Sequence, residues 1–379
     1  MMIISKIKTA NNKLFGSRGL IILSILSFTA CNSEQSPDVR PNIILMIGDG
    51  MGVSQVTAAS YWNPDESNFY RFNTVGLIET SSTSHKVTDS ASGATAFSIG
   101  EKTYKRAIGV TSDGASKKTI LEELRDEGSQ TGLISLTSIT HATPASFYAH
   151  VADRDMHQDI ASQLVDSDID FFAGGGWTYF KERDDNRDLF QEFENKGYEL
   201  DSLALPSQLE ANTKYGFLLD RESLPSKTEG RDKFLQDASA FAIEAFQKND
   251  QPYFLMIEGS YIDWGGHAEN AQMMIQEAVD FDHTIGTVMD MIADDANALI
   301  VVTADHETGG ASIGKYYEED IAGNRVEIPD TLGVYFNTDQ HTASMVPVFA
   351  KGYKEKLFSG VYPNDMIYHK LRDVVQLPN

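Results

Sequence analysis

Ser90 lies in the stretch Val87–Ala96, whose residue types allow a reactive hydroxyl at the start of a helix. Thr88 or Asp89 can cap such a helix, and the small residues that follow let it pack closely. Ser90 would then occupy the first turn, where free backbone N–H groups and the positive end of the helix dipole favour an anion. Taken alone, the stretch is described more simply as a capped helix rich in Ala and Ser, so the case for chemistry depends on the rest of the chain.

Carboxylate and imidazole side chains also stand at the ends of three hydrophobic runs. These are Asp49 after residues 41–47, Glu258 after residues 253–257, and Asp305 with His306 after residues 298–304. Continuous apolar runs are typical of parallel strands buried on both faces, and ligands bind beyond the carboxyl ends of such strands. One such residue is readily explained as a turn or a capping acid, but four placed alike are not.

Three further candidates, Asp263, His267 and His341, are expected in adjoining loops or helical turns. The Asp-x-x-x-His spacing puts the first two on one face of a helical turn, or aims both from a loop. So many carboxylates at one edge would raise one another's pKa or repel, unless cations lie between them. Imidazole and carboxylate without thiolate suit catalytic Zn²⁺, and two ions about 4 Å apart can hold the attacking and leaving oxygens of an in-line displacement.

Thr143 and Arg154 are weaker candidates, because each has an ordinary structural explanation. The Thr143 hydroxyl is a hard oxygen ligand that suits Mg²⁺, but Pro144 fits the first position of a helix, which would make Thr143 its N-cap. The planar fork of Arg154 suits phosphate oxygens, although a surface salt bridge is the commoner role of an arginine.

The elements that must position these residues alternate between strands and helices along the chain. The expected strands cover residues 41–47, 131–136, 169–173, 253–257, 298–304 and 346–350, and the clearest helical patterns cover 119–127 and 234–246. This alternation predicts an α/β fold, with a doubly wound, mostly parallel central sheet and helices on both faces. Residues 183–230 are polar and are expected to form an irregular surface excursion, and no large insertion over the site is expected between His306 and His341.

The motif Thr88-Asp89-Ser90-Ala91-Ser92-Gly93-Ala94-Thr95-Ala96 resembles the nucleophile motif of alkaline phosphatases. Thr103-Tyr104 and Ala107-Ile108-Gly109-Val110 continue the likeness, which runs from about Pro41 to about Gly352 and is weakest in 183–230. The resemblance implies hydrolysis of phosphate monoesters through a phosphoserine intermediate, releasing phosphate for scavenging. It implies two Zn²⁺ ions, one Mg²⁺ ion and a fold of the alkaline phosphatase type.

The resemblance also assigns roles to individual residues. It implies Ser90 as nucleophile, Arg154 as the phosphate clamp, and metal sites at Asp263, His267 and His341, at Asp49, Asp305 and His306, and at Asp49, Thr143 and Glu258. His141 and Trp264 stand where some members of the family have Asp, and Lys or His, so both are expected beside the magnesium site and the phosphate. Lys105-Arg106 stands where Asn-Gly is more usual, and the sequence offers no account of that change.

The first 30 residues have the features of a targeting segment, with Lys6, Lys8, Lys13 and Arg18 before the short apolar run 20–28. Cys31, the single cysteine, follows a small residue and resembles a bacterial lipoprotein cleavage site, with ordinary signal-peptide cleavage as the alternative. We therefore expect a leader at 1–30, a tether at 31–40, and one catalytic domain at 41–379, exported as a periplasmic, outer-membrane or cell-surface lipoprotein. A lone cysteine allows no internal disulfide.

The formal net charge of −24 becomes −28 when the four basic residues of the leader are removed. Such a charge argues against nucleic acid or an anionic lipid surface as a partner, so contact with the membrane is expected only through a lipid on Cys31. It suits a phosphatase only if bound cations and an arginine reverse the field inside the site. The resemblance implies small phosphomonoesters as substrates, and its family is often homodimeric.

Three other functions fit the sequence less well. A sulfatase needs a Cys/Ser-x-Pro-x-Arg motif, which Ser90-Ala91-Ser92-Gly93-Ala94 does not match. A phosphodiesterase of the same superfamily usually lacks the third metal site, whereas Thr143 and Glu258 are present here. A surface-anchored binding protein without catalysis would not need both an intact nucleophile and a full ligand set.

Overall fold

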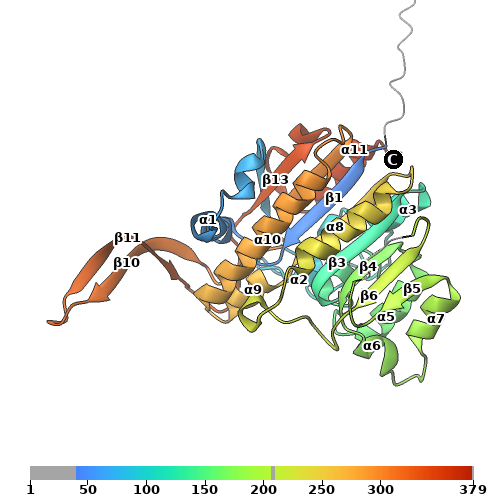
Figure 1. Ribbon diagram of the computed structural model, residues 1–379, viewed down its shortest axis with the longest axis horizontal. Coiled ribbons are helices and arrows are strands. Elements are labelled where there is room, and N and C mark those ends of the chain that lie inside the picture. The colour runs from blue at the N-terminus through green and yellow to red at the C-terminus, as the bar shows by residue number, and fades with distance from the viewer. Residues whose placement is uncertain (1–39, 206–209, 378–379) are drawn as a thin grey trace, which may run out of the picture. The chain divides into compact units, whose positions relative to one another are not determined.

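The computed structural model describes residues 40–205 and 210–377 (Figure 1). The expected leader at 1–30, Cys31 and the tether up to residue 39 lie outside the described residues. Within the described part of the chain, no helix has the length and apolar character that crossing a membrane would require.

A ten-stranded sheet organises the described residues. Its strands, in the order in which they lie side by side, are β14 (Gly360–Pro363), β2 (Thr74–Glu79), β13 (Val346–Gly352), β8 (Ala298–Thr303), β1 (Asn42–Gly48), β7 (Tyr253–Gly259), β3 (Gln130–Ser138), β4 (Phe171–Gly175), β6 (Lys214–Leu218) and β5 (Tyr198–Asp201). From β8 to β5 all neighbours are parallel, whereas β13 is antiparallel to both β8 and β2. The expected mostly parallel sheet is therefore confirmed.

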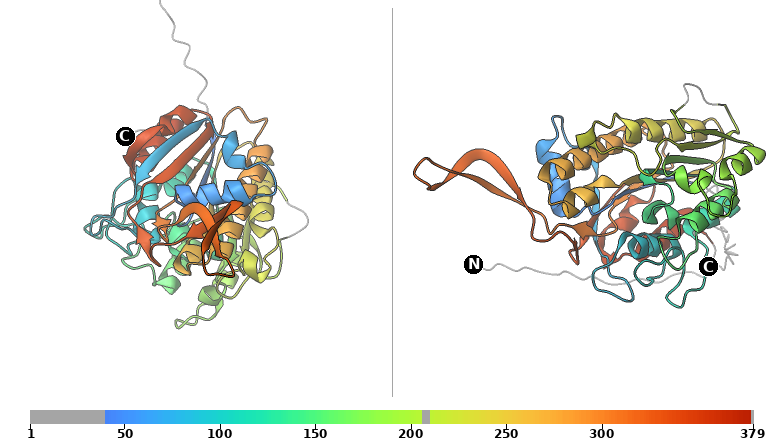
Figure 2. Two further views of the ribbon diagram at one scale, coloured as in Figure 1. Left: turned by 90° about the vertical axis from the view of Figure 1, so that its left-hand side faces the viewer. Right: turned by 90° about the horizontal axis from the view of Figure 1, so that it is seen from below.

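Helices cover both faces of this sheet, as the sequence predicted (Figure 2). The α8 helix (Phe234–Gln247) and the α10 helix (Ala271–Met291) lie on one face, and α3 (Ile120–Asp126) and α11 (Met366–Val375) lie on the other. The remaining helices are α1 (Val53–Trp62), α2 (Ser90–Ile99), α4 (Ala142–Ala145), α5 (His157–Asp166), α6 (Thr178–Lys181), α7 (Leu189–Asn195), α9 (Tyr261–His267) and the 3₁₀ turns η1 (Asn68–Arg71), η2 (Lys227–Glu229) and η3 (Glu355–Phe358).

The four central strands β8, β1, β7 and β3 carry the core and aim the candidate residues at one edge. Every residue of β3, β7 and β8 is buried, which explains their apolar runs. Parallel register places Ile47 beside Glu258, and Glu258 beside Ser135. Asp49 and Asp305 follow the ends of β1 and β8, so the three carboxylates come from three adjacent strands.

Residues 183–230 differ from the irregular excursion that the sequence predicted. They contain α7, β5 and β6, and the two strands extend the central sheet in parallel beyond β4. Three of their aromatic residues are buried: Phe193 packs against Phe172, and Phe217 packs against Phe171 and Tyr215. The edge strand β5 leaves two of its four residues exposed, which contributes to the polar composition of the segment.

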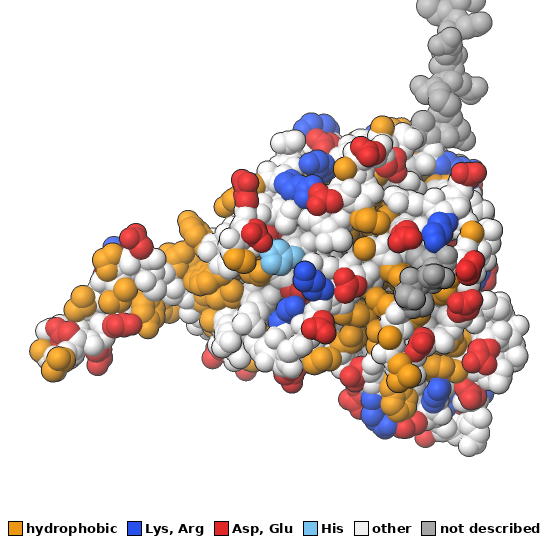
Figure 3. Space-filling view, viewed as in Figure 1, with side chains coloured by type: hydrophobic (Ala, Val, Ile, Leu, Met, Phe, Trp, Pro, Cys, Tyr) orange, Lys and Arg blue, Asp and Glu red, His pale blue; other side chains and the backbone are white. Residues whose placement is uncertain are grey.

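The segment between His306 and His341, for which the sequence predicted only the absence of a large insertion over the site, consists mainly of β-strands. It pairs Glu307–Thr308 (β9) with His341–Thr342 (β12), and between them Ser312–Glu319 (β10) and Arg325–Tyr335 (β11) form an antiparallel hairpin. The hairpin extends away from the central sheet (Figures 1 and 2), and hydrophobic side chains gather along it and at its base (Figure 3). This segment therefore forms a projecting hairpin and not an insertion that covers the site.

Candidate metal centre and nucleophile

Three groups of side chains at the carboxyl edge of the sheet could each hold a metal ion. They are Asp263 with His267 and His341, Asp49 with Asp305 and His306, and Asp49 with His141 and Glu258. Within each group, one ligand atom per residue lies within 4.8 Å of the others. The structure thus brings together all the residues for which the sequence predicted a metal role, with Thr143 buried on α4 next to His141.

The buried carboxylates lack the partners that carboxylates in a protein interior normally have. Both oxygens of Asp49 and Oε1 of Glu258 accept no hydrogen bond, and both residues are buried. Burial, and then the charge of Asp305, raises the pKa of Asp49 well above its usual range, and burial also raises the pKa of Glu258. Oxygens left in this state fit bound cations, which would keep the carboxylates ionised.

Two histidines of the first group point their Nε2 atoms at each other. Nδ1 of His267 lies 2.6 Å from the carbonyl of Asp339, and Nδ1 of His341 lies 2.9 Å from the carbonyl of Thr88. A carbonyl only accepts, so both Nδ1 atoms donate, and a ring in this tautomer presents an unprotonated Nε2. These Nε2 atoms are 3.0 Å apart, an unfavourable arrangement that a cation between them would relieve.

Thr308 fixes the ring of the third histidine, and the sequence reasoning had missed it. Its hydroxyl donates to Asp263, so it accepts from Nδ1 of His306 at 3.2 Å. Nε2 of His306 then faces three oxygens: Asp305 Oδ2 at 3.1 Å, Asp49 Oδ1 at 3.5 Å and Ser90 Oγ at 3.3 Å. In the absence of a cation, burial would lower the pKa of His306, but the Asp305 carboxylate raises it.

Ser90 begins α2 as predicted, with Asp89 as the N-cap residue whose side chain accepts from the Ser92 N–H. All ten residues of α2 are buried, so the small side chains serve close packing. Gly93, for example, faces Asp305: a Cβ there would lie 3.0 Å from its carbonyl oxygen. The helix is thereby seated against the second ligand group, with the Ser90 hydroxyl directed at it.

The region around Glu258 differs from the sequence expectation in two ways. The α4 helix begins at Ala142 with His141 as its N-cap residue, so the alternative that Thr143 is the N-cap is wrong. His141 lies among the candidate ligands rather than merely beside them, and burial followed by the charge of Arg154 lowers its pKa to about 3. Ser135 and Ser260 both donate to Glu258 Oε2, which turns Oε1 toward the site. No residue pattern indicates this role, because Ser135 in β3 and Ser260 before α9 are of a type that is common in both places.

Arg154 reaches the site from the loop before α5. Its NH1 lies 3.4 Å from Asp89 Oδ2, and its NH2 donates to His141 Nε2 at 3.0 Å. Only 17% of its side chain is exposed, so it is not the surface salt bridge that the sequence left open. Trp264 is 40% exposed on α9 with its ring against Tyr261, and its expected place beside a phosphate stays a prediction.

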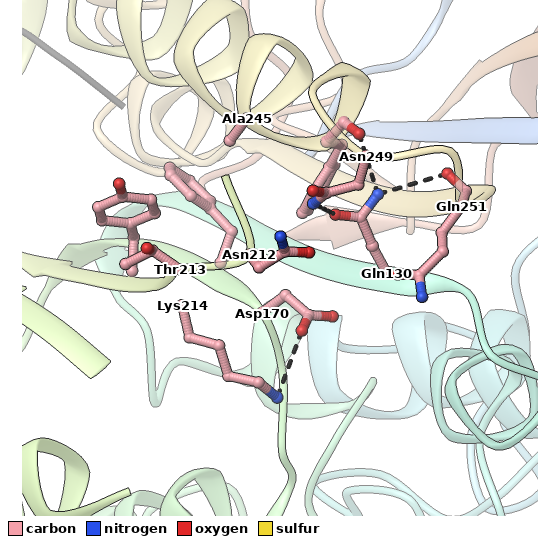
Figure 4. Close-up of a pocket in the computed structure, with 11 residues that line it drawn as sticks. Gln130, Asp170, Asn212, Thr213, Lys214, Ala245, Asn249 and Gln251 are labelled. Atoms are coloured by element: carbon pink, nitrogen blue, oxygen red, sulfur yellow. Dashed lines mark hydrogen bonds and ion pairs between the residues drawn. The ribbon is translucent and has the colours of Figure 1, made fainter. Parts of the chain in front are cut away.

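A separate cavity of about 150 Å³ lies at the opposite edge of the sheet (Figure 4). Gln130, Asp170 and Lys214 line it near the first residues of β3, β4 and β6, and its polar groups pair with one another. None of the predicted site residues lines this cavity. The candidate metal ligands therefore lie at the carboxyl edge of the sheet and not in this cavity.

Comparison with known proteins agrees with this geometry. The family model for alkaline phosphatase matches residues 40–340. Alkaline phosphatase 3 of Bacillus subtilis (strain 168) is 35% identical over 324 residues, which cover 78% of this chain and 70% of the relative. Alkaline phosphatase 4 of the same organism is 34% identical, and the match covers 77% of this chain and 66% of the relative. The chain thus spans about two thirds of the length of these relatives.

Solved structures show the same similarity. The alkaline phosphatase of the Antarctic bacterium TAB5 is 41% identical, with a TM-score of 0.85 over 90% of this chain and 99% of that one. A variant of the same enzyme, with a histidine replaced by aspartate and Mg bound in its M3 site, is 42% identical with a TM-score of 0.86 and the same coverage.

Proposed function

Because this chain belongs to the alkaline phosphatase family and is a phosphoric monoester hydrolase, we propose that Ser90 accepts the phosphoryl group from the substrate and that water then releases it as phosphate. The observation that carries the assignment is the place of Ser90, at the start of α2 and 3.3 Å from His306, a member of the second ligand group. Cations held by that group would lower the pKa of the Ser90 hydroxyl, which activates a serine as a nucleophile.

Different residues of the site bind the phosphoryl group and attack it. Arg154, held by Asp89 and His141, offers its guanidinium fork to two phosphate oxygens. The positive end of α2, where Ser90 lies, favours the negative charge of the phosphoryl group. Ser90 supplies the attacking oxygen, so the protein mainly positions charge, as is general for this reaction.

We propose two Zn²⁺ ions and one Mg²⁺ ion as the cofactors, on the basis of donor chemistry. Asp263, His267 and His341 would hold the first zinc, and Asp49, Asp305 and His306 the second, since both sets join imidazole to carboxylate. Asp49, Thr143 and Glu258 would hold the magnesium through oxygen atoms. When bound, these cations supply Lewis-acid charge that lowers the pKa of a coordinated hydroxyl and stabilises the transferring phosphoryl group.

The nearest rival is a phosphodiesterase of the same superfamily, and a substrate pair separates the two. We expect p-nitrophenyl phosphate to be hydrolysed with a kcat/KM at least about a hundredfold above that of bis-p-nitrophenyl phosphate, because only a dianionic monoester matches Arg154 and the cations together. Phosphate release at alkaline pH with each substrate measures the ratio. A ratio near one, or a preference for the diester, would assign the enzyme to the diesterases.

His141 is expected to make the third site a poor one for Mg²⁺. An imidazole neighbour replaces a possible oxygen ligand, and Mg²⁺ prefers oxygen, whereas zinc accepts nitrogen. The TAB5 variant with Mg in its M3 site carries the reverse change, from histidine to aspartate. Activity of this enzyme should therefore rise on addition of Mg²⁺, and His141→Asp should lower the Mg²⁺ concentration for half-activation at least about tenfold.

A magnesium titration of activity after dialysis measures this effect. His157→Asp is a matched control, because His157 faces Thr140 and stacks on Tyr179 instead of the carboxylates. A parent enzyme that needs no added magnesium, together with an Asp variant that binds it no more tightly, would contradict the role given to His141. Trp264, which carries no charge to hold phosphate, should add to fast product release.

We further propose that the enzyme is exported and anchored by a lipid on Cys31, in the periplasm or at the cell surface, where it scavenges phosphate. The basic and apolar pattern of residues 1–30 and the placement of Cys31 support this. Cys31→Ser should move the activity from the membrane fraction to the soluble fraction. Activity that stays with the membranes in that variant would mean that another feature holds it there. The homodimer that the resemblance implies is likewise a proposal, which the sedimentation of the purified enzyme tests.

A further inference from the structure

The turn at Lys105-Arg106 has an unusual backbone conformation. Arg106 has a φ of 78°, in the left-handed region that glycine adopts without strain, which accounts for the Asn-Gly pair more usual there. A side chain other than glycine, asparagine or aspartate persists in this region only where its surroundings hold it, and such residues gather at functional sites. The contacts that Arg106 makes show what holds it.

The backbone of Arg106 contacts both the phosphate-binding arginine and its carboxylate partner. Its N–H lies 3.2 Å from each oxygen of Asp89, and its carbonyl accepts from the N–H of Arg154 at 2.9 Å. Asp89 in turn lies 3.4 Å from the Arg154 guanidinium. The turn therefore joins the main chain of Arg154 to the carboxylate that faces its side chain.

The side chain of Arg106 holds the two residues that flank Arg154. Its Nε and NH2 form a two-pronged pair with the Asp153 carboxylate, both at 2.8 Å, and NH2 also contacts Asp155. The hydrogen bonds from Arg106 lower the pKa of Asp153 to about 2, so the pair stays ionised throughout the working range. Side chains of Arg106 and Asp153 are each 43% exposed, so this pair contributes little to overall stability, and its value lies in geometry.

We propose that Arg106 is a positioning residue that sets the place of Arg154 in the phosphate site. The Arg106 side chain binds Asp153 and Asp155, the residues on either side of Arg154. The backbone N–H of Arg106 orients Asp89. The inference rests on the proposed function only in that Arg154 binds phosphate. Loss of the fork would let the 152–156 loop move, and a small displacement of a positioned group costs affinity for the phosphoryl group.

The test compares two substitutions at this position. Arg106→Ala keeps the left-handed strain and removes the fork, whereas Arg106→Gly relieves the strain and removes the same fork. Both should raise the inhibition constant for inorganic phosphate and the KM for p-nitrophenyl phosphate by about three- to tenfold, with kcat changed by about twofold or less. Arg106→Lys, which keeps one ion pair, should recover part of the loss. Arg221→Ala, which removes a similar exposed fork onto Glu182, is the matched control and should change neither constant.

A double-mutant cycle with Arg154→Ala separates positioning from a general structural role. In that background Arg106→Ala should have almost no further effect on the phosphate constant, because the group that it positions is gone. An equal loss in both backgrounds, or an unchanged phosphate constant for Arg106→Ala and Arg106→Gly, would overturn the inference. If Arg154→Ala alone left the phosphate constant unchanged, the role of Arg154 in the proposed function would fail first, and the inference with it.

Discussion

Ser90→Ala should lower kcat for phosphate monoesters by at least about a thousandfold and abolish the covalent phosphoenzyme, because the variant lacks the hydroxyl that accepts the phosphoryl group. Ser90 Oγ lies 3.3 Å from His306 Nε2 in the first turn of α2, where the helix dipole and the ligand groups meet. The change removes one oxygen that makes no other contact essential to the fold, so zinc content should stay near that of the parent.

Acid quenching with radiolabelled phosphate measures the phosphoenzyme, and peptide mapping locates the label. Ser92→Ala is a matched control, since Ser92 is a buried serine of the same helix whose hydroxyl lies 2.7 Å from Asp89. That variant should keep its label on Ser90. A label on any other residue, or turnover by Ser90→Ala near that of the parent, would refute the assignment of the nucleophile.

Removal of the metal ions should abolish activity and lower the melting temperature by on the order of 10 °C, because ions bound only to the folded state stabilise it by mass action. The structural reason is the set of buried oxygens without hydrogen bonds on Asp49 and Glu258, together with the paired Nε2 atoms of His267 and His341. Without cations these groups repel one another or take up protons.

The pH dependence of the metal-free protein follows from the raised pKa values of Asp49 and Glu258. An acid whose pKa is higher in the folded state contributes its full stability below its unfolded pKa of about 4, and loses it as the pH rises through the folded value. These two carboxyls therefore favour the metal-free fold at mildly acidic over neutral pH, whereas His141 and His341, whose pKa values burial lowers to about 3 and about 4, act in the opposite direction. Asp305, whose pKa is lowered to about 2 by His306 against the effect of burial, acts oppositely but only in strong acid.

Melting temperatures measured between about pH 5 and about pH 8, with and without a chelator, check this prediction. This range lies above the ordinary pKa values of carboxylates. The gap between the two melting temperatures should widen as the pH rises, and zinc with magnesium should restore both stability and activity. Asp49→Asn removes a ligand shared by two groups and should narrow the gap. Equal melting temperatures with and without chelator, or full activity in its presence, would contradict a metal centre at this edge.

Most of the fold and of the site could be predicted because they depend on local patterns. The apolar runs before Asp49, Glu258 and Asp305 predict both where each strand lies and where it ends. A parallel sheet brings these ends to one edge. The cap at Asp89 and the helix that begins at Ser90 follow from neighbouring residues. Residues 183–230 could not be predicted, since β5 and β6 have only four and five residues, too few to show a clear pattern, and the edge strand β5 leaves half of its residues exposed.

The sequence by itself determined which side chains are available, namely the nucleophile, the ligand set and the arginine, and which strands carry them. Only the tertiary structure decided how they face one another. The carbonyls of Thr88 and Asp339 orient His341 and His267. Because every residue has a carbonyl, this role cannot be predicted from residue type. Arg106 meets Asp153 across 47 positions of sequence, and Thr308 meets Asp263 across 45. Such contacts depend on distances that only the folded chain sets, because local spacing says nothing about which loops will lie together.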